Sequence, residues 1–126
     1  MVCLIPLTIL ILACLDAAII QMFRYRRAKV TWWIALSCAW SIGAAIGFWS
    51  GFFFEYQPSP HLRVCGFPVP GAFFHWEGPP GEEDWVDYIT PAPLTFAGSN
   101  ILIVSLATAL PVGLLFRFRE IFQSSR

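Results

Sequence analysis

The sequence is poor in charge and in the side chains that usually carry catalysis or metal binding. Only 13% of its 126 residues are charged, and it has two histidines and four cysteines. The cysteines form no CxxC pair and no tract is rich in histidine, so neither a disulfide scaffold nor a zinc ribbon is indicated. A phosphate-binding glycine loop and a nucleophile-elbow serine are also missing. We therefore predict a protein that is not an enzyme, holds no cofactor and does not bind nucleic acid.

Apolar residues, by contrast, are abundant. They make up 57% of the chain, and the mean hydropathy is positive, which is typical of membrane proteins. Three apolar runs, at residues 2–23, 31–54 and 97–117, are each long enough to cross a bilayer as a helix. The sequence predicts a single all-α membrane domain over residues 1–126. Its other parts are a connector at 24–30, a long loop at 55–96 and a tail at 118–126.

The first apolar run has a competing interpretation as a cleaved signal peptide. Such a peptide begins with a basic region ahead of its apolar core. Here no basic residue precedes the run, and the charges come after it. The pattern therefore favours a transmembrane helix.

The basic residues indicate how the chain crosses the membrane. The connector, Arg24-Tyr25-Arg26-Arg27-Ala28-Lys29, is strongly basic, and under the positive-inside rule it belongs in the cytoplasm. Three crossings then place the amino terminus outside, the carboxyl terminus inside and the long loop on the exported, periplasmic side. This arrangement leaves only Arg63 outside among the eight basic residues. We expect a bacterial inner membrane.

The long loop is rich in proline and acidic residues, but it also contains aromatic runs that argue against disorder. Residues 72–77 and 85–89 are both prone to form strands, and the turn-rich segment 78–84 separates them. This pattern predicts a β-hairpin with a long turn. Aromatic side chains are good anchors at protein interfaces, and we expect five to dock a partner: Phe73, Phe74, Trp76, Trp85 and Tyr88.

Small residues recur every fourth position in the second run, which places them on one face of a helix. This face is formed by Ala35, Ala39, Gly43, Gly47 and Gly51, and it contains two overlapping GxxxG motifs. A shorter series follows in the third run: Ser105, Ala109 and Gly113. The simplest prediction is that the two series pack against each other. The alternative is that the glycine face binds a partner subunit or a second copy.

Asp16 is the one acidic residue inside a predicted span. Burying its charge is costly, so an intramembrane carboxylate is a candidate functional residue. Ser37, Cys38 and Thr108 fall at a similar depth and are candidates to hydrogen-bond it. A structural hydrogen bond is favoured; a contact with another subunit and a transport site are the alternatives.

The long loop also holds the candidates for metal binding and one cysteine of a candidate disulfide. His61 and His75 are the best candidate metal ligands, but their spacing from neighbouring acidic residues matches no known ligand pattern. Cys3 and Cys65 form the one cysteine pair that could meet in an oxidising compartment. Unpaired thiols are the favoured state.

We predict a small accessory subunit of a larger membrane complex, with an energy-converting (respiratory or photosynthetic) assembly as one candidate. Its partners would be other membrane subunits and membrane lipids, and the aromatic residues would suit contact with a lipid or pigment. The alternative is a homo-oligomeric pore or transporter component. The chain resembles holins in being small, with three spans and a basic carboxyl end, but its long loop departs from that pattern.

Overall fold

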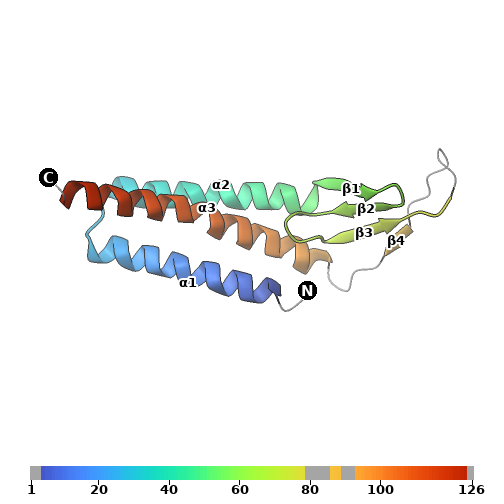
Figure 1. Cartoon of the computed structure of the whole chain (residues 1–126), viewed down its shortest axis with the longest axis horizontal. Coiled ribbons are helices and arrows are strands. Elements are labelled where there is room, and N and C mark those ends of the chain that lie inside the picture. The colour runs from blue at the N-terminus through green and yellow to red at the C-terminus, as the bar shows by residue number, and fades with distance from the viewer. Residues whose placement is uncertain (1–3, 79–85, 89–92, 125–126) are drawn as a thin grey trace.

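The computed structural model describes residues 4–78, 86–88 and 93–124. The described chain is mostly helical, with α1 at Leu4–Tyr25, α2 at Val30–Phe52 and α3 at Pro93–Ser124. Four short strands lie between α2 and α3: β1 at Glu55–Ser59, β2 at Leu62–Cys65, β3 at Ala72–His75 and β4 at Val86–Tyr88. The strands lie beyond one end of the helices, so the molecule is long and narrow (Figure 1).

All three predicted spans are helices that are long and apolar enough to cross a membrane, over Leu4–Tyr25, Val30–Phe52 and Gly98–Gln123. The third helix is longer than predicted. It begins at Pro93 and continues through Pro111 to Ser124, well past the predicted end at residue 117. The predicted membrane class is therefore supported by length and composition.

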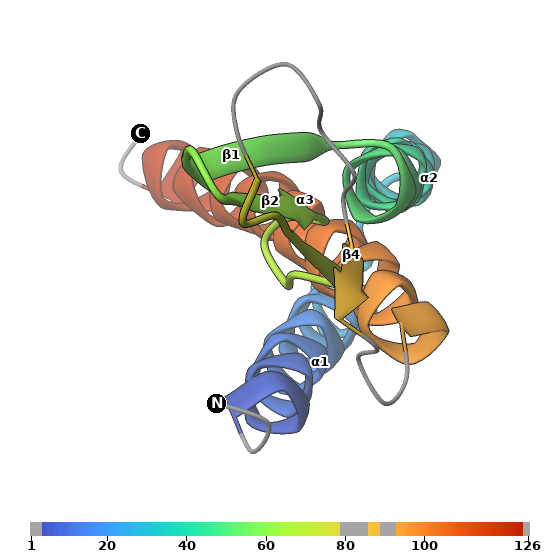
Figure 2. The same cartoon turned by 90° about the vertical axis from the view of Figure 1, so that its right-hand side faces the viewer.

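The helices are arranged with α3 between α1 and α2 (Figures 1 and 2). The connector between α1 and α2 lies at the same end as the last turns of α3, and the sheet lies at the opposite end. We call these the basic end and the sheet end of the molecule.

The four strands form one antiparallel sheet in the order β1-β2-β3-β4. The predicted hairpin is present as β3 and β4, with Phe73 opposite Tyr88 and His75 opposite Val86. Strands β1 and β2 were not predicted. β1 is an edge strand with a register shift between Tyr56 and Ser59, and such a position tolerates a proline, here Pro58.

The helical core lies towards the basic end, where all three helices contribute. Its buried residues are Phe23, Leu36, Ala109 and Phe116. The Phe23 ring lies 4.6 Å from that of Phe116 and 5.4 Å from that of Trp33, the latter edge to face. Aromatic pairs in such geometry add about 0.5–1.5 kcal/mol each beyond the burial of their area. The aromatic contacts therefore join α1, α2 and α3 at one point.

Helix α1 ends in a Schellman motif, in which the chain turns sharply through a left-handed residue. The Ala28 N–H donates to the Phe23 carbonyl, and the Arg27 N–H donates to the Arg24 carbonyl. The left-handed position is usually glycine, but here it is Arg27, with a φ of 48°. Ala28 packs on the core around Phe23, which is the apolar contact that accompanies this motif.

Candidate functional site

Two glycines allow close contact between α2 and α3. A Cβ added at Gly47 would lie 2.6 Å from the Asn100 carbonyl oxygen and 2.8 Å from the Ile101 Cα. One added at Gly43 would overlap the Thr108 hydroxyl and lie 2.7 Å from the Ser105 Cα. The two backbones are therefore so close that only glycine fits at these positions without a shift.

Two hydroxyl groups of α3 strengthen the same contact. Ser105 Oγ donates to the Trp40 carbonyl at 2.9 Å, and Thr108 Oγ1 donates to the Ala39 carbonyl at 2.8 Å. Close packing of small residues, with hydroxyl bonds to backbone, is how membrane helices associate. We call this contact the α2–α3 seam.

The remaining small residues of the two series have other surroundings. Gly113 faces α1, because a Cβ there would lie 2.6 Å from the Ile19 side chain. The prediction that Gly113 packs against α2 is thus corrected, because the atoms nearest to it belong to α1. Gly51 lies beside Gly66 at the sheet, Ala109 is fully buried in the core, and Ala35 is half-buried.

Asp16 is buried, with 3% of its surface exposed. Its Oδ2 accepts a hydrogen bond of 2.7 Å from the indole N–H of Trp40 on α2, whereas Oδ1 is buried and has no hydrogen-bond partner among the described residues. The predicted partners Ser37, Cys38 and Thr108 were wrong. The partner is instead Trp40, whose indole N–H is a donor that can serve a carboxylate inside a span.

A residue that sequence reasoning missed, Asn100, fastens the sheet end to α3. It is fully buried, and its amide makes two bonds of 2.8 Å with Val69, accepting from the backbone N–H and donating to the carbonyl. This paired arrangement satisfies both backbone groups of a buried residue. The one available signal was an amide side chain at the start of an apolar run.

The segment around Val69 is also fastened to α2. The Phe67 N–H donates to the Ser50 carbonyl at 3.1 Å, and the Gly66 N–H donates to the Phe54 carbonyl at 2.9 Å. Gly66 has a φ of 98°, a conformation that favours glycine. The loop between β2 and β3 thus bridges the end of α2 and the start of α3.

Of the five predicted docking residues, the structure describes the burial of three, Phe73, Phe74 and Trp76, and none of these three is exposed. Trp76 is buried, with 8% exposed, and its ring stacks on that of His61 at 6.1 Å. Its burial leaves little of its surface open to a partner. Phe73 and Phe74 are half-buried, Tyr88 pairs with Phe73 through β4, and Trp85 lies outside the described residues.

An aromatic surface does exist, but it lies at the junction of α2 and β1. We call it the junction cluster; its members are Phe48, Trp49, Phe52, Phe53, Phe54, Tyr56 and Phe67. Ring contacts of 4.9–6.3 Å link them into two groups. Phe53 is 63% exposed and Phe67 58% exposed.

The histidines have partners other than a metal. His61 Nδ1 lies 3.1 Å from the Trp76 carbonyl oxygen, and His75 Nε2 lies 3.1 Å from Glu77 Oε1. Within residues 4–78, 86–88 and 93–124, no three histidine, cysteine or acidic side chains gather as a metal site would need. The suggested pair of Cys3 and Cys65 is untested, because Cys3 lies outside the described residues.

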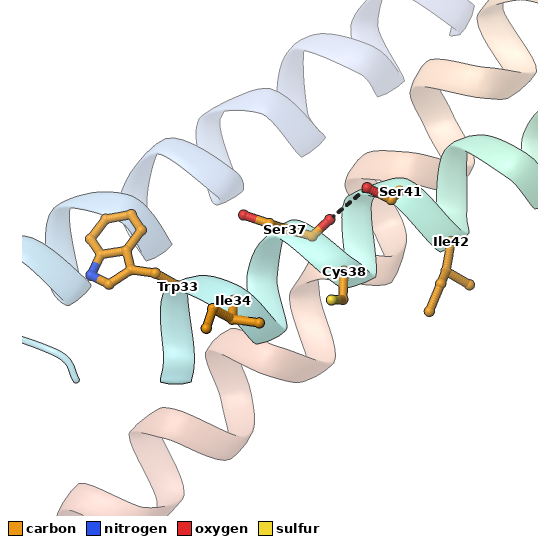
Figure 3. A pocket seen from close by; sticks show the side chains of 6 residues that line it. All are labelled: Trp33, Ile34, Ser37, Cys38, Ser41 and Ile42. Carbon is orange, nitrogen blue, oxygen red and sulfur yellow. Dashed lines mark hydrogen bonds between the residues drawn. The ribbon is translucent and has the colours of Figure 1, made fainter. Parts of the chain in front are cut away.

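A shallow, mostly apolar hollow on α2 is lined by six residues: Trp33, Ile34, Ser37, Cys38, Ser41 and Ile42. Figure 3 shows Ser37 and Ser41 on it, with the Ser41 hydroxyl bonded to the Ser37 carbonyl at 2.9 Å. The hydroxyl is thereby satisfied within its own helix, as is usual for serine in a span. The hollow presents no charged group.

Comparison with known proteins gives no relative. No protein-family model, no curated protein and no solved structure matches this chain. The geometry therefore has to carry the functional argument.

Proposed function

We propose that the chain is a small, non-catalytic integral membrane subunit that docks into a larger membrane protein assembly. The observation that carries the proposal is the junction cluster, an exposed aromatic surface held rigidly at the sheet end. The basic end would face the cytoplasm, since it carries the excess of arginine and lysine. The sheet end would then face the opposite side, the periplasm if the membrane is a bacterial inner membrane.

Rigid attachment makes the junction cluster suitable for docking. Phe67 lies in the loop that is bonded to Ser50 and Asn100, and Phe53 follows directly after α2. Rigid aromatic side chains lose little conformational entropy on binding and bury a large area. The cluster therefore offers anchors of the kind found in protein interfaces.

The internal use of the glycine face supports a subunit over a homo-oligomeric pore. Gly43 and Gly47 are covered by α3, so they are not available to close a ring of identical chains. Nor does any described group of side chains suggest catalysis.

Extraction in a gentle detergent followed by size analysis tests the proposal. The tagged full chain should migrate with further membrane proteins, and Phe53→Ala should weaken that association at least tenfold. Phe122→Ala is the matched control, because Phe122 is 72% exposed but lies at the basic end. A lone monomer with no co-purifying protein, or equal loss from both variants, would contradict the proposal.

A further inference from the structure

A small polar pocket lies at the basic end, between the connector and the last turns of α3. It has a volume of about 210 Å³. Four cationic side chains line it, Arg26, Arg27, Lys29 and Arg119, with a single carboxylate, Glu120. The pocket therefore has a clear positive excess.

The one carboxylate is already engaged. Glu120 Oε2 lies 3.3 Å from Arg26 Nε, and the guanidinium of Arg119 lies over the Trp32 ring at 6.0 Å. Among the described residues, no acidic side chain pairs with Arg27 or Lys29. Arg119 has no such pair either, so three cations line the pocket without a carboxylate partner in the described part of the chain.

Two of these cations occupy positions where local structure favours other residues. Arg27 holds the left-handed position of the Schellman motif, where glycine is the stable choice. Lys29 is the N-cap of α2 and makes no side-chain capping bond. Serine, threonine, aspartate and asparagine are preferred at an N-cap. A cation there is also unfavourable, because the amino end of a helix carries a partial positive charge. Both departures place positive charge in the pocket.

We propose that this pocket binds the phosphate of an anionic phospholipid headgroup. Arginine and lysine bind phosphate through charge-assisted hydrogen bonds, and the open start of α2 adds a favourable dipole. Trp32 and Phe116 line the apolar side of the pocket, and they continue into the helical core. A site with a cationic rim beside the ends of three apolar helices lies where lipid headgroups are found. The proposal does not depend on the docking role above.

Lipid retention by the purified full chain tests the site. The chain is reconstituted with phosphatidylglycerol or phosphatidylcholine, and bound lipid is counted by native mass spectrometry. We expect phosphatidylglycerol to be retained preferentially. Arg119→Gln should lower its affinity about fivefold, in line with roughly 1 kcal/mol per cation near the surface.

Arg117→Gln is the matched control, because Arg117 lies two residues away on α3, does not line the pocket and carries the same charge. It should change the affinity less than twofold. A second variant, Arg27→Gly, should raise the thermal midpoint in phosphatidylcholine by a few degrees, because glycine relieves the left-handed position. The same variant should lower phosphatidylglycerol affinity about fivefold. Opposite effects on stability and binding would separate a binding site from a structural one.

Four results would overturn the proposal. Equal retention of the two lipids would exclude an anion-selective site. Equal loss from Arg117→Gln and Arg119→Gln would show diffuse attraction. If inorganic phosphate alone raised the thermal midpoint of the chain as much as phosphatidylglycerol does, the pocket would be a free-phosphate site. Loss of a co-purifying acidic protein on Arg119→Gln, with lipid retention unchanged, would assign the pocket to a protein partner.

Discussion

The α2–α3 seam and the contacts of α1 are built in different ways. The seam has glycines at van der Waals contact with the opposite backbone and two hydroxyl bonds to backbone carbonyls. Helix α1 is held by the aromatic core near the basic end, by Ile19 over Gly113 and by the bond from Trp40 to Asp16. Towards its start it runs apart from α2 (Figure 1).

This difference shows two ways of fixing a helix without a hydrophobic driving force. Lipid tails are as apolar as leucine, so burial of leucine gains little in a bilayer. The seam depends on shape, and any side chain added to it must push two backbones apart. Helix α1 depends on the aromatic contacts of Phe23 and on the hydrogen bond between Trp40 and Asp16. Larger or smaller side chains along its outer face should therefore be tolerated.

Gly47→Leu should have the largest effect. Its side chain would meet the backbone of Asn100 and Ile101, which cannot move aside as a flexible side chain can. We expect a loss of at least about 4 kcal/mol of stability and no recoverable folded protein. Ala45→Leu, on the exposed face of α2, should be recovered at normal yield. Folded Gly47→Leu protein with an unchanged thermal midpoint would refute the seam.

Asn100→Leu should detach the sheet end from α3 while leaving the helices packed. It would leave the backbone N–H and carbonyl of Val69 unpaired and buried, at about 1–3 kcal/mol for each group. Limited proteolysis should then cut between β2 and β3 at least tenfold faster. Ser99→Ala is the control, because the Ser99 hydroxyl donates to the Phe96 carbonyl within its own helix. Unchanged cleavage in Asn100→Leu would contradict this role.

The polar pair of α1 should have the smallest effect, tested by a double-mutant cycle. Trp40→Phe alone would leave both Asp16 oxygens without a partner, and Asp16→Leu alone would leave the indole N–H without one. Replacing both should recover most of the loss, because two apolar groups need no partner. The coupling, measured from unfolding midpoints in detergent, should be about 0.6–1.7 kcal/mol, the range of polar pairs between membrane helices. Thr8→Val is the control: it removes a hydrogen bond within α1 and should show no coupling to Trp40→Phe. Additive effects of Asp16→Leu and Trp40→Phe would show that the Asp16–Trp40 bond does not stabilise the protein.

The apolar runs predicted the three helices, because length and hydropathy alone decide whether a segment can span. The alternating aromatic runs likewise predicted the pairing of β3 with β4. Strand β1 was not predicted because Glu55–Ser59 contains a proline and is exposed throughout, so it lacks the alternation that marks a half-buried strand. Strand β2 is only four residues long, which is too short for its pattern to stand out.

The contacts were harder to predict than the elements. A spacing of four residues places Gly113 on a face, but it does not tell which neighbour covers that face, and here it is Ile19 of α1. Depth in the membrane suggested short hydroxyl and thiol partners for Asp16, whereas the long indole of Trp40 reaches across from α2. The pairing of Asn100 with Val69 joins residues 31 positions apart, and no local pattern records it.

That last pairing also bears on how the chain closes on itself. Residues 53–92 connect α2 to α3, and a long flexible connection costs entropy when its ends are brought together. The loop around Val69 is bonded both to α2, through Phe67 and Ser50, and to α3, through Asn100. It therefore divides the connection into two shorter loops, one before Val69 and one after it. Each loop is shorter than the whole connection, so each closes at a smaller entropic cost than residues 53–92 would in one step.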